Sequence, residues 1–187
     1  MTTPLRLGIA GLGTVGTGVV KIVRRKANLL AERAGRPVTI TAVSARTRDK
    51  DRGINIRDYA WEDDPVALAT RDDVDVLVEL MGGSDGPAKA ATEAAIAAGK
   101  DVVTANKAML AHHGQALAKA AEAAGRVIRF EAAVAGGIPV VKALTEGLAG
   151  NEITRVMGVM NGTCNYILTR MQSARLPYEE VFEEANN

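Results

Sequence analysis

Three glycines near the amino terminus have the spacing of a turn that binds the phosphates of a dinucleotide. They form a Gly-x-Gly-x-x-Gly pattern directly after the apolar run 5–10 and directly before a segment with helical spacing. In such a turn the first glycine bends the chain, the second lets a pyrophosphate approach the backbone, and the third lets the helix pack closely on the sheet. Free N–H groups at the start of the helix add donors for the phosphates. A structural turn without ligand is the alternative. The predicted cofactor-binding residues of this turn are Gly11, Leu12, Gly13, Thr14, Val15 and Gly16.

The residues after the second predicted strand, 38–43, indicate which dinucleotide the turn binds. An NAD-selective site usually carries an acidic residue there, which bonds the ribose hydroxyls and repels a 2′-phosphate. Here no carboxylate occurs before Asp49, whereas Arg46 and Arg48 can form charge-assisted bonds with a phosphate. We therefore predict NADP as the preferred cofactor, with NAD as the alternative, and assign the 2′-phosphate to Arg46. Arg48 could take this role instead, and both arginines could be solvated loop residues.

Lys107 follows the predicted strand 101–104, at the edge where open α/β sheets bind their ligands. An ammonium group there can neutralise a phosphate or polarise a carbonyl. We therefore predict that Lys107 is both a catalytic and a cofactor-binding residue. A lysine that only begins a surface helix is the alternative. Gly82, shortly after the predicted strand 74–80, is also assigned to the cofactor site.

Strands and helices alternate along most of the chain, and this order positions the residues above. Strand-like apolar runs occur at 5–10, 38–43, 74–80, 101–104 and 126–130, and helices are expected from the glycine turn to Gly35, at 87–98 and at 107–124. Strand, glycine turn, helix and strand make a βαβ unit, and its continuation predicts a parallel sheet covered on both faces. The predicted fold class is α/β, a Rossmann-type doubly wound parallel sheet, followed by the start of a second α+β domain.

The pattern of the sequence changes after Ala135, where a second domain is predicted to begin. A short helix is expected from 136 to 148, then a strand at 153–160, a loop at 161–163 and an acidic helix at 178–185. The predicted domains are a dinucleotide-binding domain over residues 1–135 and a partial second domain over 136–187. Because no further element closes the second domain, we expect a truncated protein.

Composition argues against several other classes of protein. A formal net charge of +1 and an aromatic content of 3% give no basis for nucleic-acid binding. No apolar run is long enough to span a membrane, and the chain does not begin with a signal peptide, so we expect a cytoplasmic protein without membrane contact. Cys164, the single cysteine, and the adjacent His112 and His113 lack the spacing of a zinc site, so we expect structural roles for them.

Two longer motifs narrow the choice among dehydrogenases of this fold. One is Val-Thr-Ala-Asn-Lys-Ala at 103–108, followed by Leu-Ala-His-His-Gly at 110–114. The other extends from Phe-Glu-Ala-Ala-Val-Ala-Gly-Gly-Ile-Pro at 130–139 through 146–151 to 161–168. These stretches resemble the homoserine dehydrogenase family, and the resemblance covers essentially the whole chain.

The resemblance implies an enzyme that interconverts L-aspartate 4-semialdehyde and L-homoserine in threonine and methionine biosynthesis. In the family, the lysine that matches Lys107 contacts the nicotinamide end of the cofactor and the substrate region. A second lysine, the family's proposed proton donor, belongs to a later segment that this sequence lacks. The resemblance also implies a homodimer joined through the second, catalytic domain, and a structural monovalent cation, sodium or potassium. The matching cation ligands are Glu131, Val134, Gly136 and Ile138.

The residues leave two alternatives open. A different dehydrogenase of the same fold could act on another small-molecule substrate. A nucleotide-binding module without catalysis is the second alternative, because the later lysine segment is absent. Competition among small aldehydes would test the first, and restoring the downstream sequence would test the second.

Overall fold

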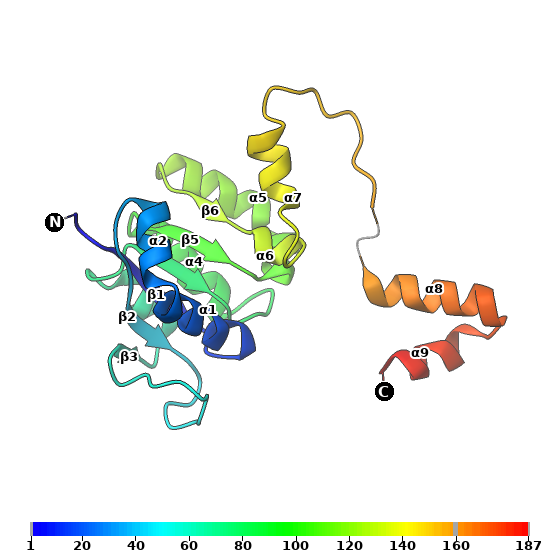
Figure 1. Ribbon diagram of the computed structural model, residues 1–187, viewed down its shortest axis with the longest axis horizontal. Coiled ribbons are helices and arrows are strands. Elements are labelled where there is room, and N and C mark those ends of the chain that lie inside the picture. The colour runs from blue at the N-terminus through cyan, green and yellow to red at the C-terminus, as the bar shows by residue number, and fades with distance from the viewer. Residues whose placement is uncertain (1, 159–160, 187) are drawn as a thin grey trace. The chain divides into compact units, whose positions relative to one another are not determined.

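The computed structural model describes residues 2–158 and 161–186 (Figure 1). The chain divides into two compact units after Thr145. The first unit contains the sheet, and the second contains two helices. The predicted boundary between functional domains, after Ala135, stays a prediction. Within the described residues, every helix is too short or too polar to cross a membrane.

A six-stranded parallel sheet forms the centre of the first unit, in the order β3-β2-β1-β4-β5-β6. The order reverses between β1 and β4, and open α/β sheets bind ligands at the carboxyl ends of strands at such a reversal. Ala10 pairs with Ser44 on one side and with Glu79 on the other, so three strands end together there. The predicted Rossmann-type sheet is confirmed. Its strands are β1 (Leu5–Ala10), β2 (Val38–Ser44), β3 (Ala60–Glu62), β4 (Val76–Glu79), β5 (Asp101–Thr104) and β6 (Ile128–Arg129).

Helices cover both faces of this sheet. Along β1, Ile9 packs in one apolar cluster and Ala10 in the other, as expected for a strand that is buried on both sides. α1 (Thr14–Arg25) and α2 (Ala27–Ala34) pack in the first cluster. α3 (Pro65–Thr70), α4 (Pro87–Ala97) and α5 (Lys107–Ala123) pack in the second, where alanines let the helices lie close to the strands.

The segments after β1 and β2 differ from the sequence prediction. The helix predicted to run from the glycine turn to Gly35 is broken at Lys26, whose φ of −112° and ψ of 22° are not helical, so α1 and α2 are separate. β3 and α3 were not expected. β3 has only three residues, too few to show a strand pattern in the sequence. The sequence does carry a signal for α3, because Asp64 is followed by Pro65. In the structure Asp64 caps the helix by accepting a hydrogen bond from the Val66 N–H, and Pro65 occupies the first turn.

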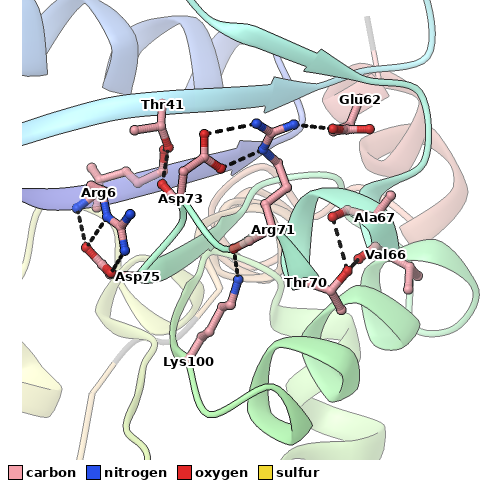
Figure 2. Close-up of polar contacts among 11 residues, drawn as sticks. Arg6, Thr41, Glu62, Val66, Ala67, Thr70, Arg71, Asp73, Asp75 and Lys100 are labelled. Atoms are coloured by element: carbon pink, nitrogen blue, oxygen red, sulfur yellow. Dashed lines mark hydrogen bonds and ion pairs between the residues drawn. The ribbon is translucent and has the colours of Figure 1, made fainter.

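Charged side chains connect the loops at the amino ends of β1, β4 and β5 (Figure 2). The Arg6 guanidinium donates to both carboxylate oxygens of Asp75 at 3.1 and 2.6 Å, and Arg71 donates to both of Asp73 at 2.7 and 2.9 Å. These hydrogen bonds lower the pKa of Asp75 and the pKa of Asp73. Lys100 donates to the Arg71 carbonyl, and burial lowers the pKa of its ammonium.

After β6 the chain forms short helices in place of the one predicted at 136–148. α6 (Glu131–Val134) follows β6, and α7 (Val140–Lys142) continues into a π-helix, η1 (Ala143–Gly147). The two carboxylate oxygens of Glu131 accept hydrogen bonds from the backbone N–H groups of Val141 at 3.0 Å and Lys142 at 2.9 Å. Glu131 therefore joins α6 to the start of α7.

The second unit is built from α8 (Gly162–Ala174) and α9 (Tyr178–Asn186). Ile167 and Val181 are buried, and Arg170 donates to Glu184 at 3.1 Å. The acidic helix predicted at 178–185 is thus confirmed as α9.

Two other predictions for the region after Gly150 are wrong. The strand expected at 153–160 is absent over 153–158, because no described strand pairs with it; residues 159 and 160 lie outside the described part. The loop expected at 161–163 is instead the start of α8, because the Asn161 side chain accepts a hydrogen bond from the Cys164 N–H at 2.8 Å and caps the helix.

Candidate cofactor site

The glycine turn joins β1 to α1, and each of its three glycines has a different steric reason. Gly11 has a φ of +103°, and a Cβ there would lie 2.5 Å from the Leu80 carbonyl oxygen. A Cβ on Gly16 would lie 2.9 Å from the Gly11 carbonyl carbon and closer still to its oxygen. Gly13 faces open space, since a Cβ on this residue would have no described atom within 4 Å. These are the three roles that a dinucleotide-binding turn requires: a tight bend, close helix packing and room for a pyrophosphate.

A cavity of about 520 Å³ lies at this turn. It brings together five of the predicted cofactor residues, namely Gly11, Leu12, Gly13, Arg46 and Gly82. The other four, Thr14, Val15, Gly16 and Lys107, are not among the described residues that line it. Thr14 and Val15 are exposed in the first turn of α1, where their backbone N–H groups are at the amino end of the helix.

Positive charge gathers at the end of the cavity that follows β2. Arg46, Lys50 and Arg52 line it there, with Asp63 as the one carboxylate among the described lining residues. Arg48 instead lines a neighbouring cavity of about 430 Å³, and its guanidinium lies over the Trp61 ring, 5.8 Å from the centroid. The structure therefore separates the two arginines that the sequence left as alternatives.

Sequence reasoning missed Arg52, which organises the loop between β2 and β3. Its guanidinium donates to the backbone carbonyls of Lys50 at 2.9 Å and Arg48 at 3.3 Å, and also to that of Thr47. The loop thus wraps around one side chain, with Arg46 and Lys50 on the cavity. The spacing of basic residues at 46, 48, 50 and 52 is a visible signal, but spacing alone does not show which of them face inward.

Lys107 is exposed at the start of α5, next to a buried helix cap. The Asn106 side chain accepts a hydrogen bond from the Met109 N–H at 3.1 Å, and its amide donates to the Gly83 carbonyl at 2.7 Å. The first turn of α5 is therefore tied to the loop that follows β4. That loop contributes Met81 and Gly82 to the cavity.

A carboxylate that the sequence analysis did not select lies at the end of β4. Glu79 is fully buried. One of its oxygens accepts hydrogen bonds from the N–H groups of Met81 at 2.7 Å and Gly82 at 3.3 Å, and the other accepts from the Thr104 hydroxyl at 2.6 Å. A sequence signal existed, because Glu79 is a charge inside the otherwise apolar run 76–80.

The four residues predicted to bind a cation lie close together along the chain in the first unit. Glu131 is half-buried, whereas Val134, Gly136 and Ile138 are exposed. Both oxygens of Glu131 already accept backbone hydrogen bonds, although each oxygen keeps lone-pair capacity. No cluster of three or more acidic, histidine or cysteine side chains that could hold a metal occurs in the described residues. This finding does not test the predicted site, because three of its four ligands are backbone carbonyls.

The adjacent histidines and the cysteine lie away from the turn in sequence. His113 Nε2 is 2.8 Å from a carboxylate oxygen of Asp85, and hydrogen bonds from Ser84 and then His113 lower the pKa of Asp85. This contact connects α5 to the loop after β4, a role that sequence spacing did not predict. Cys164 is exposed in the first turn of α8.

The strand order, the glycine turn and the cavity at the reversal of the sheet define a Rossmann-type dinucleotide-binding domain. Residues 11–131 match the family described as "Homoserine dehydrogenase, NAD binding domain", and residues 139–187 match "Homoserine dehydrogenase". The chain therefore belongs to the homoserine dehydrogenase family.

Curated relatives agree with this family. The chain is 44% identical over 182 residues to a homoserine dehydrogenase of Neisseria gonorrhoeae, with 97% of this chain and 41% of the relative covered. It is 41% identical over 183 residues to the homoserine dehydrogenase of Bacillus subtilis, with 98% and 42% covered. The chain thus spans less than half the length of these relatives.

Solved structures show the same fold. A homoserine dehydrogenase from Thiobacillus denitrificans matches with a TM-score of 0.87 and 40% identity, covering 98% of this chain and 42% of that one. A hyperthermophilic archaeal homoserine dehydrogenase mutant in complex with NADPH matches with a TM-score of 0.79 and 27% identity, covering 98% and 60%.

Proposed function

We propose that this chain forms the cofactor-binding part of a homoserine dehydrogenase that interconverts L-aspartate 4-semialdehyde and L-homoserine, with NADP preferred and NAD as the alternative. The observation that carries the proposal is the cavity at the glycine turn. It joins the open space beside Gly13 to the cations of Arg46 and Lys50. A pyrophosphate needs such space beside the backbone, and a 2′-phosphate needs such positive charge. The reaction would serve threonine and methionine biosynthesis.

The residues of this chain would bind and orient the reactants. Bound NADPH would supply the hydride that reduces the aldehyde. The N–H groups at the start of α1 would bind the pyrophosphate, and Arg46 the 2′-phosphate. The ammonium of Lys107, at the carboxyl edge of the sheet, would stabilise negative charge near the nicotinamide end and the substrate oxygen.

Calorimetric titration with NADPH and with NADH tests the cofactor assignment. We expect tighter binding of NADPH, and a loss of about tenfold or more for NADPH in Arg46→Ala, because a charge-assisted bond to the phosphate is removed. NADH affinity should change little. Arg48→Ala is the matched control, since Arg48 lies over Trp61 at the neighbouring cavity. Equal affinities for the two cofactors, or equal losses in both variants, would contradict the role of Arg46.

Catalysis needs a separate assay. Because the family's proposed proton donor belongs to the later segment, the assay uses the chain with its downstream sequence restored. We expect oxidation of L-homoserine with NADP to be measurable there as NADPH formation, and Lys107→Ala to reduce its rate while the Tm stays within about a degree, because Lys107 is exposed. If the extended chain binds NADPH without oxidising homoserine, the alternative of a nucleotide-binding module is favoured. A stronger response to another small alcohol would favour a different dehydrogenase.

The cation site is proposed at Glu131 and the backbone carbonyls of Val134, Gly136 and Ile138, with a structural role for sodium or potassium. Carboxylate and carbonyl oxygens suit a hard cation. Thermal unfolding in sodium, potassium and choline chloride at equal ionic strength tests this site. A Tm raised by one of the two metal ions, and not in Glu131→Gln, would support it; identical Tm values in all three salts would exclude it.

Assembly and location are also proposals. We propose a homodimer joined through the second domain, acting in the cytoplasm on a small-molecule substrate, without nucleic-acid or membrane partners. Light scattering across a concentration series would report the mass of the assembly. A monomer at all concentrations would contradict the homodimer for this chain.

A further inference from the structure

The hydrogen bonds around Glu79 have a fixed direction. The Thr104 hydroxyl accepts a hydrogen bond from the Asn106 N–H at 3.0 Å, so its own proton is available for the Glu79 carboxylate, 2.6 Å away. The other Glu79 oxygen receives the N–H groups of Met81 and Gly82. Every neighbour that the structure gives to this carboxylate therefore acts as a donor.

This network joins two parts of the proposed cofactor site. On one side lies the loop after β4, where Gly82 and Gly83 have φ values of +79° and +90° and Met81 and Gly82 line the cavity. On the other side lies the start of α5, because Thr104 holds the backbone of Asn106 and the Asn106 amide returns to the Gly83 carbonyl. Lys107 follows directly. Glu79, Thr104 and Asn106 are all buried, at 0%, 1% and 4% exposure, so water does not compete for these bonds.

We propose that Glu79 is a positioning residue, whose buried carboxylate holds the Met81–Gly83 loop and, through Thr104 and Asn106, the first turn of α5 in one arrangement that receives the nicotinamide half of the cofactor beside Lys107. The inference rests on the proposed function, since it concerns the same cofactor. Glu79 itself acts through the loop and the helix start. Glu79 is thus the residue that orients these two segments of the proposed cofactor site.

The chemistry requires a carboxylate at this position. A glutamine has one acceptor oxygen and one NH₂ group. With its oxygen toward Met81 and Gly82, its NH₂ would face the Thr104 hydroxyl and displace that proton from its acceptor. With the amide turned, the NH₂ would face two backbone donors. The first orientation leaves the Thr104 hydroxyl proton without its acceptor, and the second leaves the N–H groups of Met81 and Gly82 without theirs, although Glu79→Gln changes neither the size nor the shape of the side chain.

The position of the network in the sheet predicts which half of the cofactor responds. Rossmann-type sheets bind a dinucleotide as two mononucleotide halves on either side of the strand reversal. The loops after β1 and β2 carry Arg46 and would receive the adenosine half, whereas β4 and β5 belong to the other half. A fault at Glu79 should therefore weaken NADPH, which has a nicotinamide, more than 2′,5′-ADP, which has only the phosphorylated adenosine half.

The experiment is calorimetric titration of both ligands, with Tm measured alongside, for five variants of the chain. Glu79→Gln leaves a donor without its acceptor, Thr104→Val removes the hydroxyl, and Thr104→Ser keeps it. Thr92→Val is the matched control, because Thr92 is equally buried but its hydroxyl donates only within α4, to the Ala88 carbonyl at 2.9 Å. The double variant Glu79→Gln/Thr104→Val tests whether the two residues act together.

The expected result is a loss of about tenfold in NADPH affinity for Glu79→Gln and for Thr104→Val, with 2′,5′-ADP affinity unchanged. Thr104→Ser and Thr92→Val should bind NADPH as the unsubstituted chain does. The double variant should lose little more than either single variant, because one network is broken only once. If Glu79→Gln does not fold, the Thr104→Val and Thr104→Ser pair gives the same comparison.

Two results would overturn the inference while leaving the proposed function intact. One is unchanged NADPH affinity in the folded variants. The other is an equal loss for NADPH and 2′,5′-ADP that follows the fall in Tm, which is the behaviour of a residue that only stabilises the sheet. If the unsubstituted chain binds neither ligand, the proposed function fails together with the inference.

Discussion

Gly13 is the residue at which the proposed cofactor binding can be separated most clearly from folding. Its backbone is extended, with φ −77° and ψ −162°, so an alanine causes no strain, and the added methyl group would meet no described protein atom within 4 Å. The same methyl group would occupy the space in which a pyrophosphate approaches the turn. A methyl group at this position should therefore leave the fold intact and obstruct the proposed pyrophosphate.

Gly13→Ala should weaken NADPH binding by about tenfold or more, while the free energy of unfolding falls by about 1 kcal/mol at most, the cost of alanine at a helix amino cap. Titration calorimetry and urea unfolding measure the two quantities. Gly18→Ala is the control, since Gly18 lies within α1 with equally open surroundings. Unchanged NADPH affinity in Gly13→Ala would contradict the assignment of the turn to the pyrophosphate.

Among single residues, the sequence predicted those whose spacing defines the glycine turn, and it missed those whose roles depend on side-chain contacts in the folded chain. Gly11, Gly13 and Gly16 are recognisable because their spacing follows from the geometry of one turn. Arg52 and Glu79 were missed because their roles depend on where the loops after β2 and β4 fold back. Whether Arg46 or Arg48 faces the cavity depends on the packing of Arg48 against Trp61, a residue of the unpredicted β3.

The first turn of α1 packs against the glycine turn only because Gly16 has no Cβ. Gly16→Ala should destabilise the fold by about 3 kcal/mol or more, because its methyl group overlaps the Gly11 carbonyl, which belongs to the backbone of the turn. Gly18→Ala, two residues later, should stabilise α1 by about 0.5–1 kcal/mol through helix propensity. Urea unfolding of both variants checks this contrast. Equal effects of the same sign would show that the turn is free to move away from α1.

Elements were predictable where burial is symmetric and pairing partners exist. The apolar runs that became β1, β2 and β4 are buried by helices on both faces, and their composition reflects this. The strand-like segment at 153–158 contains Ile153 and Val156 but has no pairing strand in the described residues, and a strand without a partner does not form. The break at Lys26 is not visible in the sequence, because lysine is a good helix former and tertiary packing decides where α1 ends.

The stability of the first unit should depend on pH, because two of its aspartates have lowered pKa values in the folded state. The hydrogen bonds from Arg6 and Arg71 lower the pKa values of Asp75 and Asp73 in the folded state, so each carboxylate contributes stability above its unfolded pKa of about 3.9. That contribution is lost as the pH falls through the lower, folded pKa. Stability should therefore decrease below about pH 4.

Asp75→Asn should lower the free energy of unfolding at about pH 6 by about 1 kcal/mol and reduce the difference between about pH 6 and about pH 3. Urea unfolding at the two pH values measures both effects. Asp49→Asn, at an exposed loop carboxylate, is the control and should leave the difference unchanged. An unaltered pH dependence in Asp75→Asn would mean that its pairing with Arg6 does not persist in solution.

The whole-molecule prediction came from two sources. Alternating strands and helices predicted the parallel sheet, and the long motifs at 103–114 and 130–168 predicted the family that the comparisons show. The division after Thr145 could not be predicted, because it follows from which residues the folded chain brings into contact, and the sequence around position 145 does not show those contacts.

The ion pairs of Arg6 and Arg71 lie at the amino ends of the strands, whereas the glycine turn and Arg46 lie at the carboxyl ends. The sheet thus offers protein engineers two separate design surfaces. Substitutions around Arg71 and Asp73 would therefore change thermal stability without changing cofactor preference. Substitutions in the 46–52 loop, which belongs to the proposed cofactor site, would change cofactor preference without removing the ion pairs at the opposite edge.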